Sequence, residues 1–129
     1  MSGARPILIV DDDQTLRQML VEQLQVEGEF QAVEADSVAA AWEALKAPDA
    51  RFDAIILDVT LPDGDGRDFC VELRRAGLRM PIVMLTGSDD EADIVRGLDA
   101  GANAYVAKPS RIAEMLARLR ALLCVSGTR

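Results

Sequence analysis

The chain has 129 residues, half of them apolar, which is enough for one domain with a single hydrophobic core and too apolar for a disordered chain. Its 22 acidic and 14 basic residues give a net charge of −8, which repels phosphate backbones and argues against direct binding of nucleic acid. It contains no histidine, which excludes histidine-based nucleophile systems, the usual zinc sites and a role as a phosphohistidine carrier.

The first half of the chain predicts two strands, each followed by a helix. Runs of apolar and β-branched residues predict a strand at Pro6–Val10 and a weaker one at Phe30–Ala35. Ser37 is the expected N-cap of the second helix. The first helix is predicted to end at Gly28 and to carry one apolar face, made by Leu16, Met19, Leu20 and Leu24.

The second half predicts three more strand–helix pairs. Strands are expected at Ala54–Leu57, Pro81–Leu85 and Ala104–Ala107, and the first of them runs into a loop that carries Pro62, Gly64 and Gly66. Asp65 is the expected cap of the helix that follows this loop, and Ser88 with Glu91 forms a capping box for the next one. That next helix is expected to turn three residues inward: Ile94, Val95 and Leu98. Steady helical spacing predicts a last helix with Ile112, Met115, Leu116, Leu119, Leu122 and Leu123.

Strict alternation of strand and helix, repeated five times, predicts an α/β fold with a parallel sheet and helices on both faces. A single domain is expected over 1–129, with its core at about 6–123 and a tail at 125–129. No run reaches membrane-spanning length and the N-terminus lacks a signal-peptide pattern, so a cytoplasmic protein is expected. Cys70 and Cys124 lie far apart among apolar neighbours and are predicted to be reduced and buried; a redox pair is the alternative.

Polar residues stand directly after four of the five predicted strands. Asp58 follows the third strand, and alone it is compatible with a turn residue or a helix cap as well as with chemistry. The full set is an acid pair, an acid, a hydroxyl and an ammonium: Asp11 and Asp12, Asp58, Thr86, and Lys108. Because the carboxyl ends of parallel strands meet at one edge of the sheet, these side chains are expected to converge, and capping alone does not account for them.

Carboxylates that converge in this way repel one another, and a hard divalent cation removes the repulsion. An all-oxygen set with room for water suits Mg²⁺. Lys108 adds a point charge suited to a phosphoryl oxygen, and Thr86 adds a hydroxyl donor. A carboxylate nucleophile, a cation, an ammonium and a hydroxyl together predict a phosphoryl-transfer site.

These motifs resemble the receiver domain of two-component response regulators, over Pro6 to about Leu123. The resemblance is carried by four motifs: Ile-Val-Asp-Asp, Asp-x-x-Leu-Pro-x-x-Asp-Gly, Leu-Thr-Gly and Tyr-x-x-Lys-Pro. It implies the flavodoxin-like strand order 2-1-3-4-5, with five helices.

The resemblance also implies a role for each site residue. Asp58 would be the phosphoacceptor, for a phosphoryl group from a sensor histidine kinase. Asp12, Asp58 and the Thr60 carbonyl would bind Mg²⁺ directly, and Asp11 would act through water. Thr86 and Lys108 would contact the phosphoryl group. Tyr105 would be an aromatic switch that follows Thr86, with a half-buried packing role as the alternative.

The predicted function is therefore a signalling switch that catalyses only its own phosphorylation and dephosphorylation. Two alternatives stay open: a Mg²⁺-dependent phosphohydrolase with an aspartyl-phosphate intermediate, and a receiver-like module that is never phosphorylated. The first is weakened because Thr60 occupies the position where such enzymes place a general acid.

The last helix is similar to that of receivers joined to a winged-helix DNA-binding domain, so a domain cut from a longer protein is the expectation. Such receivers pair through the face of the fourth helix, fifth strand and fifth helix, and a homodimer of this kind is possible here. Asn103 and Ala104 stand where those receivers carry two acids, and Ser110 replaces their aromatic residue. The arginines of the last helix are either a solvated face or dimer contacts: Arg111, Arg118 and Arg120.

Overall fold

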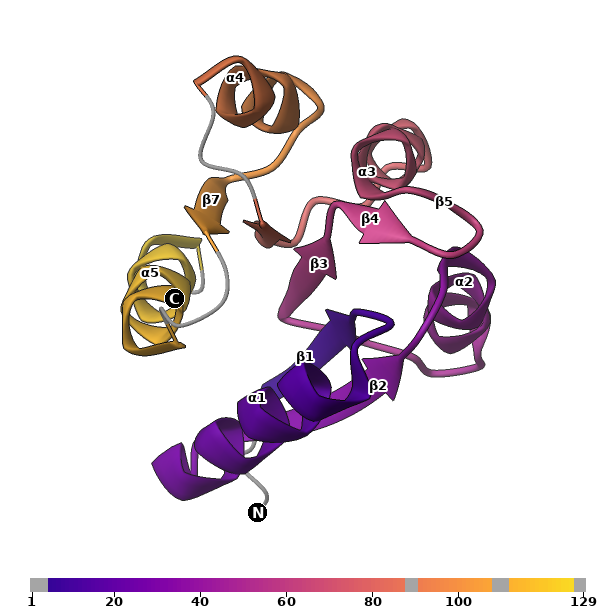
Figure 1. Cartoon of the computed structure of the whole chain (residues 1–129). Coiled ribbons are helices and arrows are strands. Elements are labelled where there is room, and N and C mark those ends of the chain that lie inside the picture. The colour runs from indigo at the N-terminus through magenta and orange to yellow at the C-terminus, as the bar shows by residue number, and fades with distance from the viewer. Residues whose placement is uncertain (1–4, 88–90, 108–111, 127–129) are drawn as a thin grey trace.

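Five parallel strands form the centre of the molecule in the computed structural model, which describes residues 5–87, 91–107 and 112–126 (Figure 1). The strands of this sheet are β1 (Arg5–Val10), β2 (Phe30–Ala35), β3 (Ala54–Asp58), β6 (Ile82–Thr86) and β7 (Ala104–Ala107). The helices are α1 (Gln14–Glu27), α2 (Val38–Lys46), α3 (Gly66–Arg75), α4 (Glu91–Asp99) and α5 (Ile112–Ser126). The order β2-β1-β3-β6-β7 confirms the predicted topology, which is the flavodoxin-like order 2-1-3-4-5 of a doubly wound parallel sheet.

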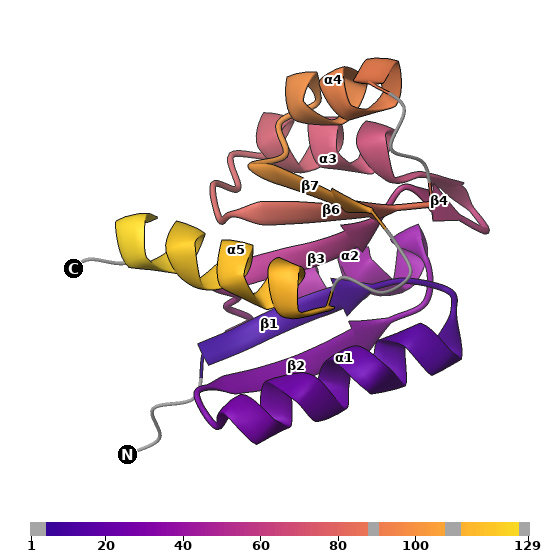
Figure 2. The same ribbon diagram turned by 60° about the vertical axis from the view of Figure 1, so that its left-hand side comes forward.

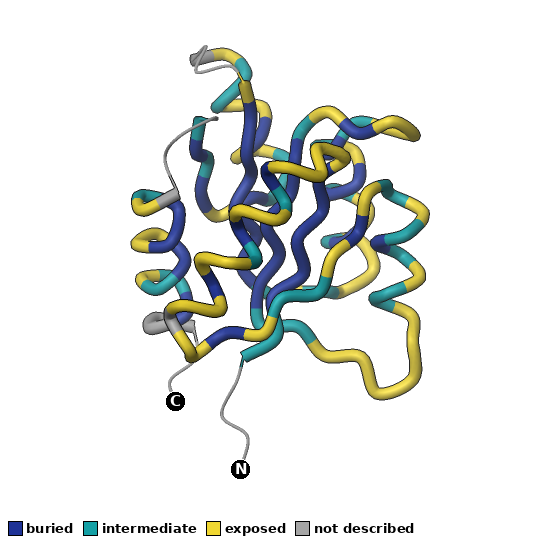
Figure 3. The backbone as a smooth tube through the Cα atoms, turned by 60° about the horizontal axis from the view of Figure 1, so that its bottom comes forward, coloured by how far each residue is buried: buried dark blue, intermediate teal, exposed yellow. Residues whose placement is uncertain are grey.

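The sheet separates two apolar layers because successive side chains of a strand point to opposite faces. In β1, Ile7 and Ile9 pack with the apolar residues of α1 and α5, whereas Leu8 and Val10 pack with those of α2 and α3. Figure 2 shows α1 and α5 on one side of the sheet and α3 and α4 on the other. Strands β3 and β6 are buried along their whole length and β1 is buried from Ile7 to Val10, whereas exposure is concentrated in helix surfaces and connections (Figure 3).

Several helix ends follow the sequence predictions. The Ser37 hydroxyl accepts a hydrogen bond from the Ala40 amide at 3.0 Å and caps α2. Asp65 caps α3 by accepting from the Arg67 amide at 2.7 Å. Gly28 ends α1 in the left-handed conformation, with φ of 77°, which a residue without Cβ adopts at little cost.

Three residues expected in apolar helix faces are substantially exposed: Met19 (45%), Val95 (49%) and Leu98 (43%). Among residues 92–99 of α4, whose burial is described, Gly97 is the buried one, and it lies against the ring of Tyr105. At about 100° per residue, Val95 then lies almost opposite the buried side of the helix and Leu98 lies at its flank. The inward orientation predicted for Val95 and Leu98 is therefore wrong, because a glycine sets the buried face of α4.

The segment after Asp58 is not the simple loop that the sequence suggested. It forms a small antiparallel hairpin of β4 (Thr60–Leu61) and β5 (Gly64–Asp65), with Pro62 and Asp63 in its turn.

Some predictions fall outside the described residues: Lys108 and Ser110, the helix cap at Ser88, Arg111, and the side chains of Glu91 and Cys124. Cys70 is described, and it is a free, buried thiol whose pKa is raised by burial.

Candidate functional site

Three carboxylates meet at the carboxyl edge of the sheet. Asp11 and Asp12 follow β1, Asp58 ends β3, and these strands are neighbours, with Val10 paired to Leu57. Each residue offers a carboxylate oxygen, and the three oxygens lie within 4.8 Å of one another. Asp11 and Asp58 are 0% and 4% exposed, whereas Asp12 faces solvent. The sequence prediction brought these acids together, and the structure places them in one cluster.

Backbone contacts hold Asp11 in position. Its side-chain Oδ1 accepts a hydrogen bond from the Asp13 amide at 2.9 Å, and its own amide donates to the Ala35 carbonyl of β2 at 3.0 Å. The guanidinium of Arg17 donates to the Asp11 carbonyl at 2.7 Å. Asp13 in turn caps α1 through the Leu16 amide. The loop after β1 is therefore tied to both β2 and α1, which fixes the acid pair at its start.

Asp58 is held by the sheet on one side and by the hairpin on the other. The Val59 amide donates to the Leu85 carbonyl of β6 at 3.0 Å, and the Gly66 amide donates to the Val59 carbonyl at 2.6 Å. The Thr60 amide approaches Asp58 Oδ1 at 3.3 Å. A Cβ on Gly66 would collide with the Asp58 carbonyl oxygen, so α3 begins against the backbone of Asp58.

The hydroxyl residue predicted for the site also lies at this edge. Thr86 ends β6 and is 6% exposed. Asp58 pairs with Leu85 in the adjacent strand, which places Thr86 one residue beyond the level of Asp58. The sequence therefore identified the strand end correctly, although Lys108, the fifth member of the predicted set, lies outside the described residues.

Tyr105 lies on β7 beside Met84 of β6, with its ring directed toward α4. A Cβ on Gly97 would meet the ring carbons at 2.5 and 2.7 Å, so the glycine makes room for the ring. The Tyr105 hydroxyl oxygen is buried, and it has no hydrogen-bond partner among the described residues. This inward orientation of the ring is compatible with both the packing role and the switch role considered for Tyr105.

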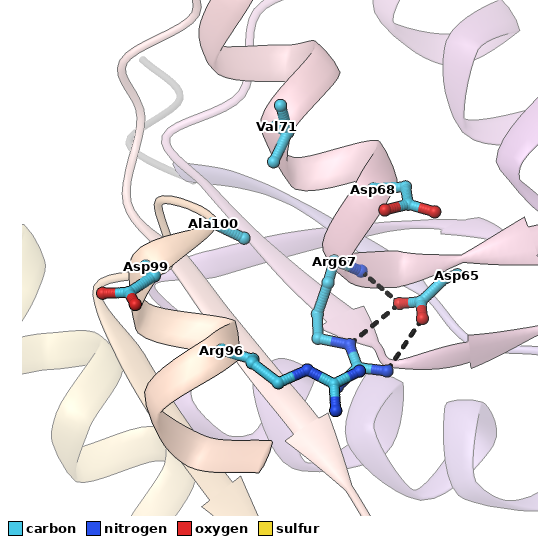
Figure 4. A pocket seen from close by; sticks show the side chains of 7 residues that line it. All are labelled: Asp65, Arg67, Asp68, Val71, Arg96, Asp99 and Ala100. Atoms are coloured by element: carbon cyan, nitrogen blue, oxygen red, sulfur yellow. Dashed lines mark hydrogen bonds and ion pairs between the residues drawn. The ribbon is translucent and has the colours of Figure 1, made fainter. Parts of the chain in front are cut away.

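A charged cluster that the sequence did not predict joins α3 to α4. Arg67 donates to both oxygens of Asp65, at 3.1 and 2.8 Å, and its guanidinium lies 3.6 Å from Asp93 of α4. The hydrogen bond with Arg67 lowers the pKa of the Asp65 carboxyl, and the same contact raises the pKa of Arg67. Arg67 and Arg96 line an open pocket of about 290 Å³. Figure 4 shows both side chains at this pocket between the two helices. Ion pairs between helices depend on tertiary structure, so no local sequence signal marks them.

The acidic cluster fits a divalent cation. Its donors are all oxygen, and two of its three carboxylates are buried close together, where a positive charge offsets their repulsion. A buried carboxylate such as Asp58, with the hydroxyl residue Thr86 at the end of the adjacent strand, is suited to phosphoryl transfer. Among the described helices, none combines the length and apolar character that crossing a membrane requires.

Comparison with known proteins places these features in a family context. Residues 7–120 match the family model described as the response regulator receiver domain. The response regulator MprA of Mycobacterium ulcerans is 44% identical over 119 residues, which are 91% of this chain and 49% of that protein. The chain thus spans about half the length of the curated relatives it matches.

Solved structures agree with this match. A two-component response regulator from Clostridium difficile superposes with a TM-score of 0.88 at 27% identity, and the match covers 96% of this chain and 99% of that one. The beryllofluoride-activated receiver domain of DrrB, a Thermotoga maritima protein, superposes with a TM-score of 0.83 at 27% identity, covering 93% of this chain and 97% of that one.

Proposed function

The chain belongs to the response regulator receiver domain family of two-component systems, and from this membership we propose that it is a switch controlled by phosphorylation of Asp58. The observation that carries the proposal is the cluster of Asp11, Asp12 and Asp58 at the carboxyl edge of the sheet. We assign Asp58 as the nucleophile because it ends the central strand β3 within this cluster, and because the next residue, Val59, is held by backbone hydrogen bonds to Leu85 and Gly66.

In the proposed transfer, a side-chain oxygen of Asp58 attacks the phosphorus of a phosphohistidine on a sensor kinase. The O–P bond forms as the P–N bond breaks, and the electron pair of that bond stays on the imidazole nitrogen. Asp12, Asp58 and the Thr60 carbonyl would hold Mg²⁺ directly, and Asp11 would act through water. Mg²⁺ bound there would neutralise the negative charge that gathers between the carboxylates and the phosphoryl oxygens. Thr86 and Lys108 would contact those oxygens.

Switching follows from the same residues. A phosphoryl group places strong acceptor oxygens where a carboxylate stood, and Thr86 at the next strand end is positioned to donate to them. Movement of Thr86 would favour the inward orientation of Tyr105 and so bias the surface of α4, β7 and α5 toward one of two states. In this structure the ring of Tyr105 already lies against Gly97 of α4.

We propose that this α4–β7–α5 face forms a homodimer that controls an output domain or a partner protein. Val95 and Leu98 are exposed neighbours on α4, which supplies an apolar contact. Several polar groups at or next to this face are already engaged within the chain: Arg118 pairs with Glu114 at 3.0 Å, and the Asn103 side chain accepts hydrogen bonds from Arg74 and from the Ile82 amide. The dimer contact proposed here is therefore apolar rather than ionic.

The test is the mass of the intact protein after incubation with acetyl phosphate and Mg²⁺. We expect the gain of one phosphoryl group, which is lost in Asp58→Asn and in the presence of a chelator. Asp36→Asn is the matched control, because Asp36 is an exposed acid that follows β2 at the same edge of the sheet. A gain that persists in Asp58→Asn would refute the assignment, and sustained release of phosphate from small phosphoesters would favour the phosphohydrolase instead.

A further inference from the structure

Asp63, in the turn of the β4–β5 hairpin, makes a long-range contact that none of the roles above uses. Its carboxylate accepts hydrogen bonds from the amides of Val38 and Ala39, at 2.8 and 3.0 Å. These are first-turn amides of α2, which have no acceptor within the helix. Asp63 therefore caps a helix that lies 25 residues earlier in the chain. Figure 1 shows the hairpin beside α2.

The charge of Asp63 suits this position. The N-terminus of a helix carries partial positive charge, so a carboxylate is stabilised there. The two backbone hydrogen bonds lower the pKa of Asp63 below its usual value of 3.8. The side chain is exposed to solvent, and with its pKa lowered it carries a negative charge at neutral pH.

The hairpin needs such an anchor because it is very small. Each of its strands has two residues, and a short isolated hairpin is at best marginally stable in water. A second contact lies at the same junction, where a Cβ on Gly64 would stand 3.5 Å from the Val38 side chain. The start of α2 and the tip of the hairpin are therefore in close contact.

The hairpin connects this junction to the acidic site. Thr60 begins β4 and pairs with Asp65, and the Thr60 amide approaches Asp58 Oδ1 at 3.3 Å. Any tilt of the hairpin would therefore move the backbone of Thr60 relative to Asp58. The tip that Asp63 holds and the end that carries Thr60 belong to one short unit.

We propose that Asp63 is a positioning residue for the acidic site, which ties the hairpin to the N-terminus of α2 and thereby sets the affinity of the site for Mg²⁺. The inference rests on the proposed function, because it takes the Thr60 carbonyl as a ligand of the cation. Asp63 itself does not touch the cation. It acts on the site through the backbone between Asp63 and Thr60.

Ser37 offers a matched control. Its hydroxyl caps the same helix by accepting from the Ala40 amide at 3.0 Å, but it belongs to the segment directly before α2 and not to the hairpin. Asp63→Ala and Ser37→Ala each remove one cap of α2. Only Asp63→Ala also releases the hairpin, so the pair separates loss of helix stability from loss of positioning.

The experiment is a titration of the isotope-labelled chain with MgCl₂, followed by the amide NMR shifts, with urea unfolding of each variant run in parallel. We expect the dissociation constant for Mg²⁺ to rise about three- to tenfold in Asp63→Ala. This is less than the effect of removing a group that hydrogen-bonds directly to a metal ligand, because Asp63 acts through the backbone. In Ser37→Ala the dissociation constant should change less than about twofold. Asp63→Asn keeps one acceptor oxygen and is expected to lie between wild type and Asp63→Ala. It also serves as the test if Asp63→Ala does not fold.

Because linkage is reciprocal, Mg²⁺ should also slow hydrogen exchange of the Val38 and Ala39 amides in the wild type. Unchanged Mg²⁺ affinity in both Asp63 variants, or an equal loss in Ser37→Ala, would overturn the positioning role and leave the proposed function intact. Absence of Mg²⁺ binding by the wild-type chain would overturn both.

Discussion

At the scale of single residues, the tightest constraint on the site is the missing side chain of Gly66. A Cβ there would overlap the Asp58 carbonyl oxygen and lie 3.0 and 3.1 Å from backbone carbons of Asp58 and Val59. These are backbone atoms at the end of the central strand and directly after it, and they cannot swing aside as a side chain would. Glycine is needed at Gly66 because α3 starts in contact with the backbone that carries the nucleophile.

Gly66→Ala is therefore expected to destabilise the fold by about 2–4 kcal/mol, because overlap with backbone must be relieved by moving β3 or α3. The measurement is urea unfolding followed by circular dichroism. Gly64→Ala is the control in the same hairpin, where the new Cβ would make an ordinary contact with Val38 at 3.5 Å and cost less than about 1 kcal/mol. Equal stabilities of the two variants would show that α3 and β3 separate easily.

At the scale of elements, the sequence predicted the sheet well and the small hairpin not at all. The three middle strands of the sheet each contain a continuous apolar run buried on both faces, a pattern typical of strands inside a parallel sheet. Each hairpin strand has only two residues and stands next to proline or glycine. A segment of two residues is too short to show the alternation of apolar and polar residues that predicts a strand.

The acidic cluster could be predicted because the order of parallel strands brings their carboxyl ends together. The contacts of Asp63 with Val38 and of Arg67 with Asp93 could not, because they join elements distant in sequence through the detailed placement of helices. The error at Val95 and Leu98 has the same origin. The burial of Gly97 under the Tyr105 ring rotates α4 away from the orientation that hydrophobicity alone favours.

The contact between β7 and α4 leads to a prediction for Tyr105→Phe. The hydroxyl is buried and finds no partner in the described part of the chain, so its removal relieves a desolvation cost and breaks no described hydrogen bond. We expect stability to be unchanged or raised by up to about 1 kcal/mol in urea unfolding. Tyr105→Ala is the control and should lose about 1–3 kcal/mol, because it removes the ring packed against α4. A loss above about 1 kcal/mol in Tyr105→Phe would reveal a partner for the hydroxyl.

At the scale of the whole molecule, the net charge of −8 opposes association of two copies. A dimer therefore needs a local apolar contact strong enough to offset this repulsion. Four large apolar side chains are exposed among the described residues, and they lie on two helices: Met19 and Val26 on α1, and Val95 and Leu98 on α4. Only the α4 pair lies on the α4–β7–α5 face proposed to respond to Asp58.

We expect the chain to be monomeric without a phosphoryl group and to dimerise when beryllofluoride and Mg²⁺ are added, as measured by sedimentation. Val95→Asp should raise the dissociation constant of this dimer at least about tenfold, because a carboxylate on each copy would replace the apolar contact and the two carboxylates would repel each other. Val26→Asp is the matched control: Val26 is 77% exposed on α1, and the same change there adds the same net charge away from the proposed face.

The comparison of these variants separates the proposed face from charge effects in general. If both aspartate variants weaken the dimer equally, net repulsion rather than the α4–β7–α5 face controls association. If Val95→Asp dimerises like the wild type, the contact lies elsewhere, and the exposed α1 pair becomes the next surface to test. Each variant should still gain one phosphoryl group from acetyl phosphate, because neither Val95 nor Val26 belongs to the acidic cluster, and a failure there would trace the loss to the site instead.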